Sequence, residues 1–195
     1  MKVKLRYLYI ICLILLAYLY LSGYRFNSRQ AADAHTYAIL EKGAQVISEV
    51  DVGWGHAYIY KSSDYYLTVM AERKGFLWIA PVSVNINTID YKNDSIRTIG
   101  YMIYSNNEDE KATILVIENQ NENIAYIEAG KQFDRYQKNV TKGELIIFVW
   151  NEALFQHDIN PIALSKDGME LYRYGYPLGT NQFRDQELKW YSIKK

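Results

Sequence analysis

The sequence predicts a mainly β protein: an N-terminal transmembrane helix and a short second helix, then an antiparallel β-meander and an immunoglobulin-like β-sandwich. Three observations support this prediction. An apolar run stands near the N-terminus, a helix-forming segment follows it, and from residue 44 onward short runs of β-branched and aromatic residues alternate with turn residues. Of the 195 residues, 49% are hydrophobic and 15% aromatic, so an ordered core is expected rather than disorder.

The first element is the uncharged stretch 7–24, which follows the basic segment 1–6 with Lys2, Lys4 and Arg6. As a helix, its eighteen residues span about 27 Å, close to the ~30 Å hydrocarbon thickness of a bilayer. Tyrosines at both ends of the stretch suit the two membrane interfaces. Because basic flanks favour the cytoplasmic side, we expect a signal-anchor of a single-pass protein in the cell membrane, with the N-terminus cytoplasmic and the C-terminal domain extracytoplasmic.

A cleaved signal peptide is the alternative interpretation of this stretch. The apolar core of such a peptide is usually about 7–15 residues long, shorter than residues 7–24. The small-residue pattern at 32–34 stands too far downstream to be a cleavage site, and residues 21–23 precede Tyr24 rather than the cysteine of a lipoprotein. A retained anchor is therefore the expectation, and cleavage stays open.

Residues 25–43 are expected to form a juxtamembrane link and a helix over residues 28–42. Ser28 is a suitable N-cap, alanines follow at the positions of the first turns, and Gly43 stands where a C-terminal cap belongs. This helix is free to continue from the membrane segment.

The rest of the chain is predicted to be antiparallel β structure, with turns rich in Gly, Asn, Asp and Ser. Strands are expected at 46–50, 56–60, 65–71, 76–79, 96–104, 113–117, 124–128, 132–140, 145–150 and 169–174. A boundary near residues 90–94 separates a β-meander subdomain (44–92) from a β-sandwich-like subdomain (93–195). One continuous sheet without a boundary is the alternative.

Charge and cysteine content exclude several classes of partner and cofactor. Beyond residues 1–24, 19 basic residues remain against 22 acidic ones, a net charge of −3. A weakly acidic domain does not suit nucleic acid, whose phosphates select basic surfaces. The single cysteine, Cys12, lies in the apolar run, so neither a disulfide nor a cysteine-rich zinc site is expected in the outer domain, and no cofactor is predicted. An external domain without disulfides favours a bacterial chain.

The β segments between residues 97 and 176 follow a recognisable order. They run GYMIYSN, NIAYIEA, LIIFVWN and IALSKDGMELYRY, and the hairpin HAYIYKSSDYYLTVMAERKGFLW precedes them, so that the pattern covers residues 56–176. This pattern resembles that of uncharacterised, single-span, membrane-anchored proteins of Bacillus-type bacteria. The resemblance implies an anchored extracytoplasmic β domain and brings no activity and no catalytic residue with it.

Four residues are candidates for ligand binding: Trp54, His56, His157 and Asp158. Glycines on both sides of Trp54 let its indole stand out of a loop, where it would stack on a sugar or fill a partner's pocket, although packing into the core is the commoner arrangement. His157 and Asp158 supply a base and a carboxylate without a nucleophile motif, so no catalytic residue is assigned. The three histidines, including His35, lack metal-site spacing, and no metal is predicted.

The sequence thus predicts a membrane-anchored extracytoplasmic module that binds or senses an unknown ligand, with a protein or the cell wall as its partner. Two alternatives stay open. One is a cell-envelope hydrolase that uses His157 and Asp158, and the other is a structural or assembly component of a membrane complex.

Overall fold

The computed structural model describes residues 2–39, 43–87, 94–106, 109–177, 179, 184 and 187–193, without the side chains of 2–5 and 38. These residues form antiparallel sheets and a few helices, which confirms the predicted mainly β class. The chain divides into two compact units, a first of residues 1–63 with 67–85 and a second of residues 64–66 with 86–195. The boundary predicted near residues 90–94 falls mostly on 88–93, outside the described residues.

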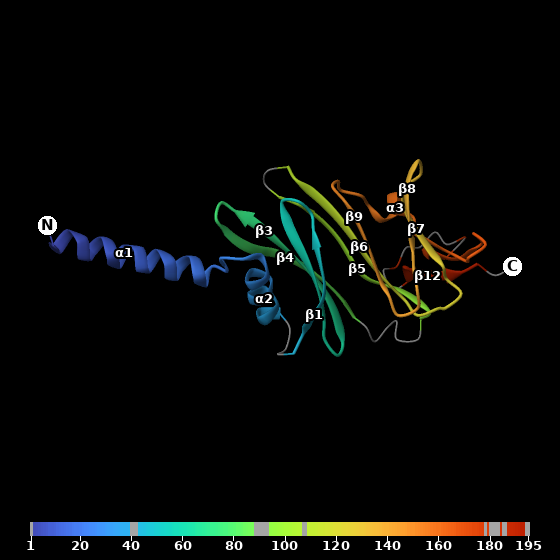
Figure 1. Cartoon of the computed structure of the whole chain (residues 1–195), viewed down its shortest axis with the longest axis horizontal. Helices are drawn as coiled ribbons and strands as arrows, with labels where there is room; N and C mark the ends of the chain where they lie inside the picture. The colour runs from blue at the N-terminus through green and yellow to red at the C-terminus, as the bar shows by residue number, and fades with distance from the viewer. Residues whose placement is uncertain are drawn as a thin grey trace. The chain divides into compact units, whose positions relative to one another are not determined.

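The described helices are α1 (Lys2–Leu21), α2 (Ser28–Ile39) and α3 (Gln156–Ile159). The first sheet contains β1 (Gln45–Asp51), β2 (Gly55–Lys61), β3 (Tyr65–Lys74) and β4 (Leu77–Asn87). The later strands, drawn from yellow-green to red in Figure 1, are β5 (Ile96–Ser105), β6 (Lys111–Asn119), β7 (Tyr126–Lys131), β8 (Asp134–Asn139), β9 (Leu145–Trp150), β10 (Ile162–Leu164), β11 (Glu170–Gly175) and β12 (Lys189–Ser192).

In the first unit, a four-stranded sheet in the order β1-β2-β3-β4 carries α2 on one face. Ala31 and Ala32 of the helix are buried against Tyr58 and Tyr60 of the sheet. Alanine side chains are small, so the helix lies close to the strands beneath it and the two tyrosine rings fill the core between them. This packing fixes the orientation of α2, and with it the set of residues that face away from the sheet.

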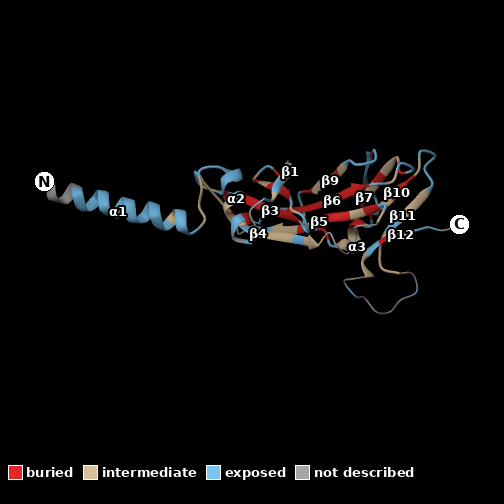
Figure 2. Ribbon diagram, turned by 90° about the horizontal axis from the view of Figure 1, so that it is seen from below, coloured by how far each residue is buried: buried red, intermediate tan, exposed pale blue. Residues whose placement is uncertain are grey.

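α1 differs from the rest of the first unit because its large side chains are exposed, as the pale blue helix in Figure 2 shows. It ends at Leu21, and α2 begins at Ser28, so the two helices are separate and the second does not continue from the first. Among the described residues, no helix combines the length and the apolar character needed to cross a bilayer. The transmembrane assignment of residues 7–24 stays a prediction.

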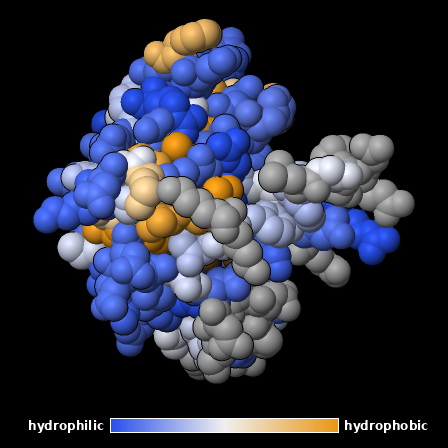
Figure 3. All heavy atoms as spheres, turned by 90° about the vertical axis from the view of Figure 1, so that its right-hand side faces the viewer, coloured by the Kyte–Doolittle hydropathy of each residue, from blue (hydrophilic) through white to orange (hydrophobic). Residues whose placement is uncertain are grey.

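The second unit contains a three-stranded sheet, β5-β6-β9, and a five-stranded sheet, β12-β11-β10-β7-β8. Alternating residues of both sheets form one apolar core, which includes Leu115 and Phe148 from the smaller sheet and Ile127, Ala163 and Trp190 from the larger one. The two antiparallel sheets therefore share one core, and β6 is buried along nearly its whole length. Seen from the side of the C-terminus, its surface is mostly hydrophilic with a patch of apolar residues between (Figure 3).

Candidate functional site

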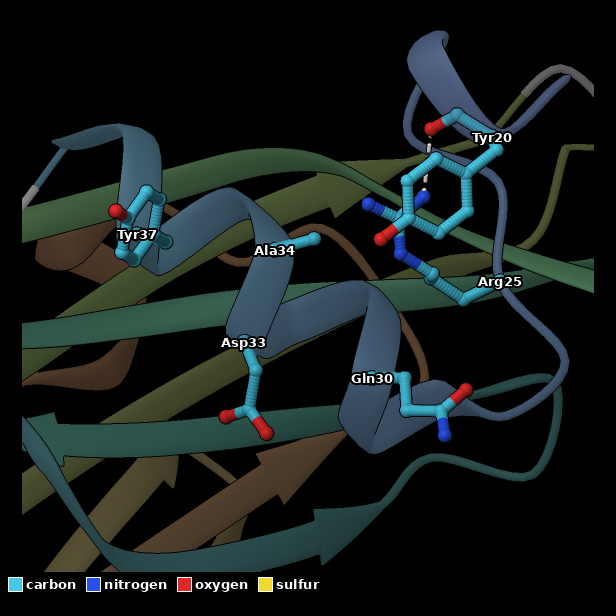
Figure 4. A pocket seen from close by; sticks show the side chains of 6 residues that line it. All are labelled: Tyr20, Arg25, Gln30, Asp33, Ala34 and Tyr37. Atoms are coloured by element: carbon cyan, nitrogen blue, oxygen red, sulfur yellow. Dashed lines mark hydrogen bonds between the residues drawn. The ribbon is translucent and has the colours of Figure 1, made fainter. Parts of the chain in front are cut away.

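A hollow of about 540 Å³ opens between the end of α1 and the exposed side of α2, both in the first unit (Figure 4). The hollow lies at the C-terminal end of α1, the helix with exposed apolar side chains. Its walls combine charged, amide and aromatic groups. The lining residues are Tyr20, Arg25, Gln30, Asp33, Ala34 and Tyr37.

The hollow exists because α1 ends abruptly in a Schellman motif. Gly23 has φ +91°, a conformation that a residue with a Cβ rarely adopts. The backbone N–H of Tyr24 donates to the carbonyl of Leu19 (3.0 Å) and that of Gly23 to the carbonyl of Tyr20 (3.2 Å). These are the two bonds that define the motif, and they satisfy the last carbonyls of the helix. The chain therefore turns away from the helix axis directly before Arg25.

Arg25 is the fixed cation of the hollow. Its Nη1 donates to the carbonyls of Tyr20 (2.7 Å) and Tyr24 (2.8 Å), and its guanidinium carbon lies 4.0 Å from the centre of the Tyr20 ring. The dashed line in Figure 4 marks the bond to Tyr20. Its backbone forms an antiparallel bridge with Trp78 of β4 through two bonds of 2.8 Å. A positive charge is stabilised here because it faces the negative end of the α1 dipole and a ring face.

Asp33 supplies the negative charge of the hollow. Its Oδ1 accepts hydrogen bonds from the Tyr60 hydroxyl (2.7 Å) and from Nε of Arg29 (2.9 Å). Burial, and secondarily the bond to Asp33, raise the pKa of Tyr60, so this phenol is a hydrogen-bond donor at any physiological pH. Both bonds end on Oδ1, which leaves acceptor capacity on the carboxylate for a ligand.

His35 fastens the far half of α2 to the sheet. Its Nε2 lies 2.9 Å from Oγ of Ser83 on β4. Burial lowers the pKa of His35, and a hydrogen bond with the backbone of Ala80 offsets only part of that effect. Although a histidine beside a serine is also the arrangement of a base and a nucleophile, neither residue lines the hollow. We interpret the pair as a link between helix and strand.

This link makes the attachment of α2 sensitive to acid. The unfolded chain binds a proton on His35 near pH 6.5, whereas the folded chain resists protonation, so stability is full above pH 6.5 and falls as the pH drops below it. We expect urea unfolding midpoints of the full chain to fall between pH 7 and pH 5, and to fall less in His35→Gln. His157→Gln, which replaces an exposed histidine, is the control. Equal pH dependence in both variants would contradict the role of His35.

The sequence-predicted candidates in the first unit do not line the hollow. Trp54 lies in the turn between β1 and β2 and is partly buried, so its indole does not stand fully out of the loop. His56 lies on β2, with Nδ1 3.1 Å from Glu49 and its ring 5.4 Å from that of Trp78. The contact with Glu49 has the distance of an ion pair but not the alignment of a hydrogen bond.

His157 and Asp158 belong to α3 in the second unit. The His157 side chain is 81% exposed, its ring stacks on Phe155 at 5.9 Å, and its Nε2 lies 3.5 Å from Asp158. Asp158 in turn accepts a hydrogen bond from the backbone N–H of Phe155 (2.9 Å) and so holds the first turn of α3. This local arrangement gives the hydrolase alternative no support.

The residues of the hollow carry only a weak signal in the sequence. Gln30, Asp33, Ala34 and Tyr37 recur at spacings of three and four, which places them on one face of a helix. Their approach to Arg25 depends on the turn at Gly23, which the pattern does not reveal. Within the part of the chain that the structure describes, no three His, Cys, Asp or Glu residues gather as metal ligands.

Comparison with known proteins gives no family for this chain, because no protein-family model, curated protein or solved structure matches it. The candidate site rests on its own geometry. A guanidinium, a carboxylate, an amide and two phenol rings face one hollow beside an apolar helix. These side chains offer both hydrogen-bond donors and acceptors, so they suit a small polar ligand that itself carries an acceptor and a donor.

Proposed function

We propose that the protein is a membrane-anchored extracytoplasmic binding module, with residues 7–24 as the anchor and residues 1–6 in the cytoplasm. One observation carries the proposal. Twelve large apolar side chains between Tyr7 and Leu21 of α1 are 48–83% exposed. An apolar surface of this extent on a folded protein marks contact with a membrane or a partner.

The distribution of these side chains favours lipid over a protein partner. Leu13, Ile14, Leu15 and Leu16 are consecutive, so they point to all sides of the helix. A partner protein that covers one side leaves the others in water, whereas lipid surrounds the whole helix. Tyrosines near both ends and the basic residues before the run match the interfaces and the orientation that anchors adopt.

The outer part of the proposed module consists of the β-meander, with α2 on it, and the sandwich, for which we propose an immunoglobulin-like arrangement. Its ligand site is the hollow beside Arg25 and Asp33. These opposite charges fit a ligand that is itself zwitterionic, with its anionic group at Arg25 and its cationic group at Asp33. A phosphoethanolamine group has this chemistry. A protein or cell-wall polymer remains the partner proposed for the outer surface.

The topology is tested by cysteine labelling on intact bacterial cells. Cys12 is replaced by alanine, and single cysteines are placed at Lys166, in an exposed turn of the second unit, and at Lys2. A membrane-impermeant maleimide is expected to modify position 166 on intact cells and position 2 only after lysis. Modification of position 2 on intact cells, or protection of position 166 until lysis, would overturn the proposal.

The hollow is tested by titrating the full chain in micelles with glycerophosphoethanolamine and following backbone amide resonances. We expect shifts confined to residues near Arg25 and Asp33. Arg25→Gln and Asp33→Asn should each weaken binding by about 10- to 150-fold, because one charge-assisted hydrogen bond contributes about 1.5–3 kcal/mol.

Arg173→Gln removes an exposed arginine of the second unit and serves as the matched control for this titration. It should leave the affinity unchanged. Affinity that is equal in all three variants, or shifts spread over the whole chain, would show that the hollow does not bind this group.

A further inference from the structure

We infer that the first unit rests on the bilayer through two phenylalanines, Phe26 and Phe76, which form a second membrane contact beside α1. This inference rests on the proposed anchor and adds the orientation of the first unit. Both side chains are exposed far beyond what is usual for phenylalanine, at 74% and 76%.

Phe76 is presented by the tight turn between β3 and β4. The turn consists of Gly75 and Phe76, and Gly75 has φ +65° while Phe76 does not adopt a positive φ. This is the pattern of a two-residue hairpin turn with glycine in its first position. Nε of Arg73 donates to the carbonyl of Gly75 (2.9 Å), which further holds the turn. Phe76 therefore projects from a rigid tip.

The backbone bridge between Arg25 and Trp78 brings Phe26 to the same place. In an antiparallel pair, residues that follow on one strand face residues that precede on the other. The pairing of Arg25 with Trp78 therefore brings the backbone at Phe26 close to the β4 end of the turn that carries Phe76. Both phenylalanines therefore stand within two residues of this bridge, and the bridge itself lies only four residues beyond Leu21, the last residue of α1.

Basic residues adjoin the two phenylalanines in the sequence. Arg25 directly precedes Phe26, and Arg73 and Lys74 directly precede the turn that carries Phe76. Arg73 is exposed, and Lys74 pairs with Glu72 at 3.3 Å. Aromatic rings flanked by basic side chains suit the headgroup layer, where the rings enter the acyl boundary and the charges meet lipid phosphates.

Continuity with α1 identifies the bilayer as the occupant of this surface. Tyr24 ends the uncharged stretch, and Phe26 follows only two residues later. If α1 spans the membrane, Phe26 and its neighbour Phe76 lie at the level of the outer headgroups because of this short distance along the chain. The hollow lined by Tyr20 and Arg25 then opens in the same layer, where a lipid headgroup reaches it directly.

The second unit offers a matched control. Phe133 is 96% exposed and is also the second residue of a two-residue hairpin turn, between β7 and β8. Phe133 is not connected to α1 by any described pairing of the backbone. Phe133 and Phe76 therefore share their exposure and their position in the turn, but only Phe76 lies next to a segment that continues from the anchor. A comparison of Phe76 with Phe133 therefore isolates the membrane contact.

The test uses the full chain, with Cys12 replaced by alanine, in liposomes of phosphatidylethanolamine and phosphatidylglycerol. A bimane label is attached to one new cysteine at a time, from Phe76→Cys, Phe133→Cys or Leu13→Cys. Lipids that carry a nitroxide high on the acyl chain quench shallow labels, and lipids with a nitroxide near the chain end quench deep ones. The exposed turn positions tolerate the label without disturbing a core.

We expect the shallow nitroxide to quench the label at 76 at least about twice as strongly as the label at 133, and the deep nitroxide to quench the label at 13. Equal quenching at 76 and 133, with position 13 quenched, overturns the second contact and leaves the anchor intact. If position 13 is not quenched by either lipid, the proposed anchor fails and this inference fails with it.

Discussion

If residues 7–24 anchor the chain as proposed, two arginines in the middle of α1 are expected to release it from the membrane. The helix contains nine leucines and isoleucines between residues 7 and 21. Each of these residues contributes about −0.3 to −0.6 kcal/mol to the free energy of membrane insertion, and together they contribute about −3 to −5 kcal/mol. The double variant Ile14→Arg with Leu15→Arg removes two of these residues and adds about 5–7 kcal/mol. The free energy of insertion then becomes positive, so insertion is unfavourable. Alkaline extraction of membranes should then recover the variant in the supernatant.

The position of the charge provides the control. Leu21→Arg introduces the same residue at the last position of α1, where a long side chain reaches the interface. This variant should stay in the membrane pellet like the unchanged chain. Retention of the double variant in the pellet would mean that α1 does not insert, whereas loss of both variants would mean that arginine disturbs something other than burial in lipid.

Arg97→Ala is expected to destabilise the second unit by about 3–5 kcal/mol, because it leaves a buried carboxylate without its ion-pair partner. Arg97 on β5 faces Glu118 on β6 as a direct cross-strand partner, and the two side chains form an ion pair in which they are only 14% and 9% exposed. Truncation of the arginine leaves Glu118 without its counter-charge in a site with little water. Chemical denaturation of the full chain should show a markedly lower midpoint.

Two comparisons separate this effect from a general loss of packing. Arg97→Met with Glu118→Leu replaces both charges by apolar groups and should recover most of the lost stability. Arg173→Ala breaks the exposed pair with Glu170 and should cost no more than about 1 kcal/mol. A single variant at Arg97 that unfolds at the same midpoint as Arg173→Ala would contradict the account of a buried ion pair.

The strands are largely predictable because β-branched and aromatic residues are concentrated in them and turn residues separate them. Alternation does not identify β3 and β6, which are buried along most of their length. The prediction at 145–150 matches β9, and that at 96–104 differs from β5 by one residue. The predicted strand at 132–140 instead begins at Asp134, because Gln132 and Phe133 form the hairpin turn. The short β10 escapes prediction since its three residues take their conformation from pairing with β7 and β11.

The candidate site is less predictable because it depends on contacts between distant segments. Gly23 is visible in the sequence, but the direction in which it turns the chain is set by the bridge between Arg25 and Trp78. The predicted candidates follow from residue type and from immediate neighbours in the sequence, neither of which reveals contacts with distant segments. His157 and Asp158 have local structural contacts, so their chemical type does not by itself indicate a site.

Hydrogen exchange tests most directly whether α1 lies in lipid. The full chain is studied in liposomes and in lipid-free buffer, and the exchange of amides between Leu8 and Leu21 is followed by mass spectrometry. A helix embedded in lipid is shielded from water, so these amides should exchange far more slowly in liposomes, while those of the sandwich core stay equally protected in both conditions. Equal exchange of the α1 amides with and without lipid would contradict the anchored module.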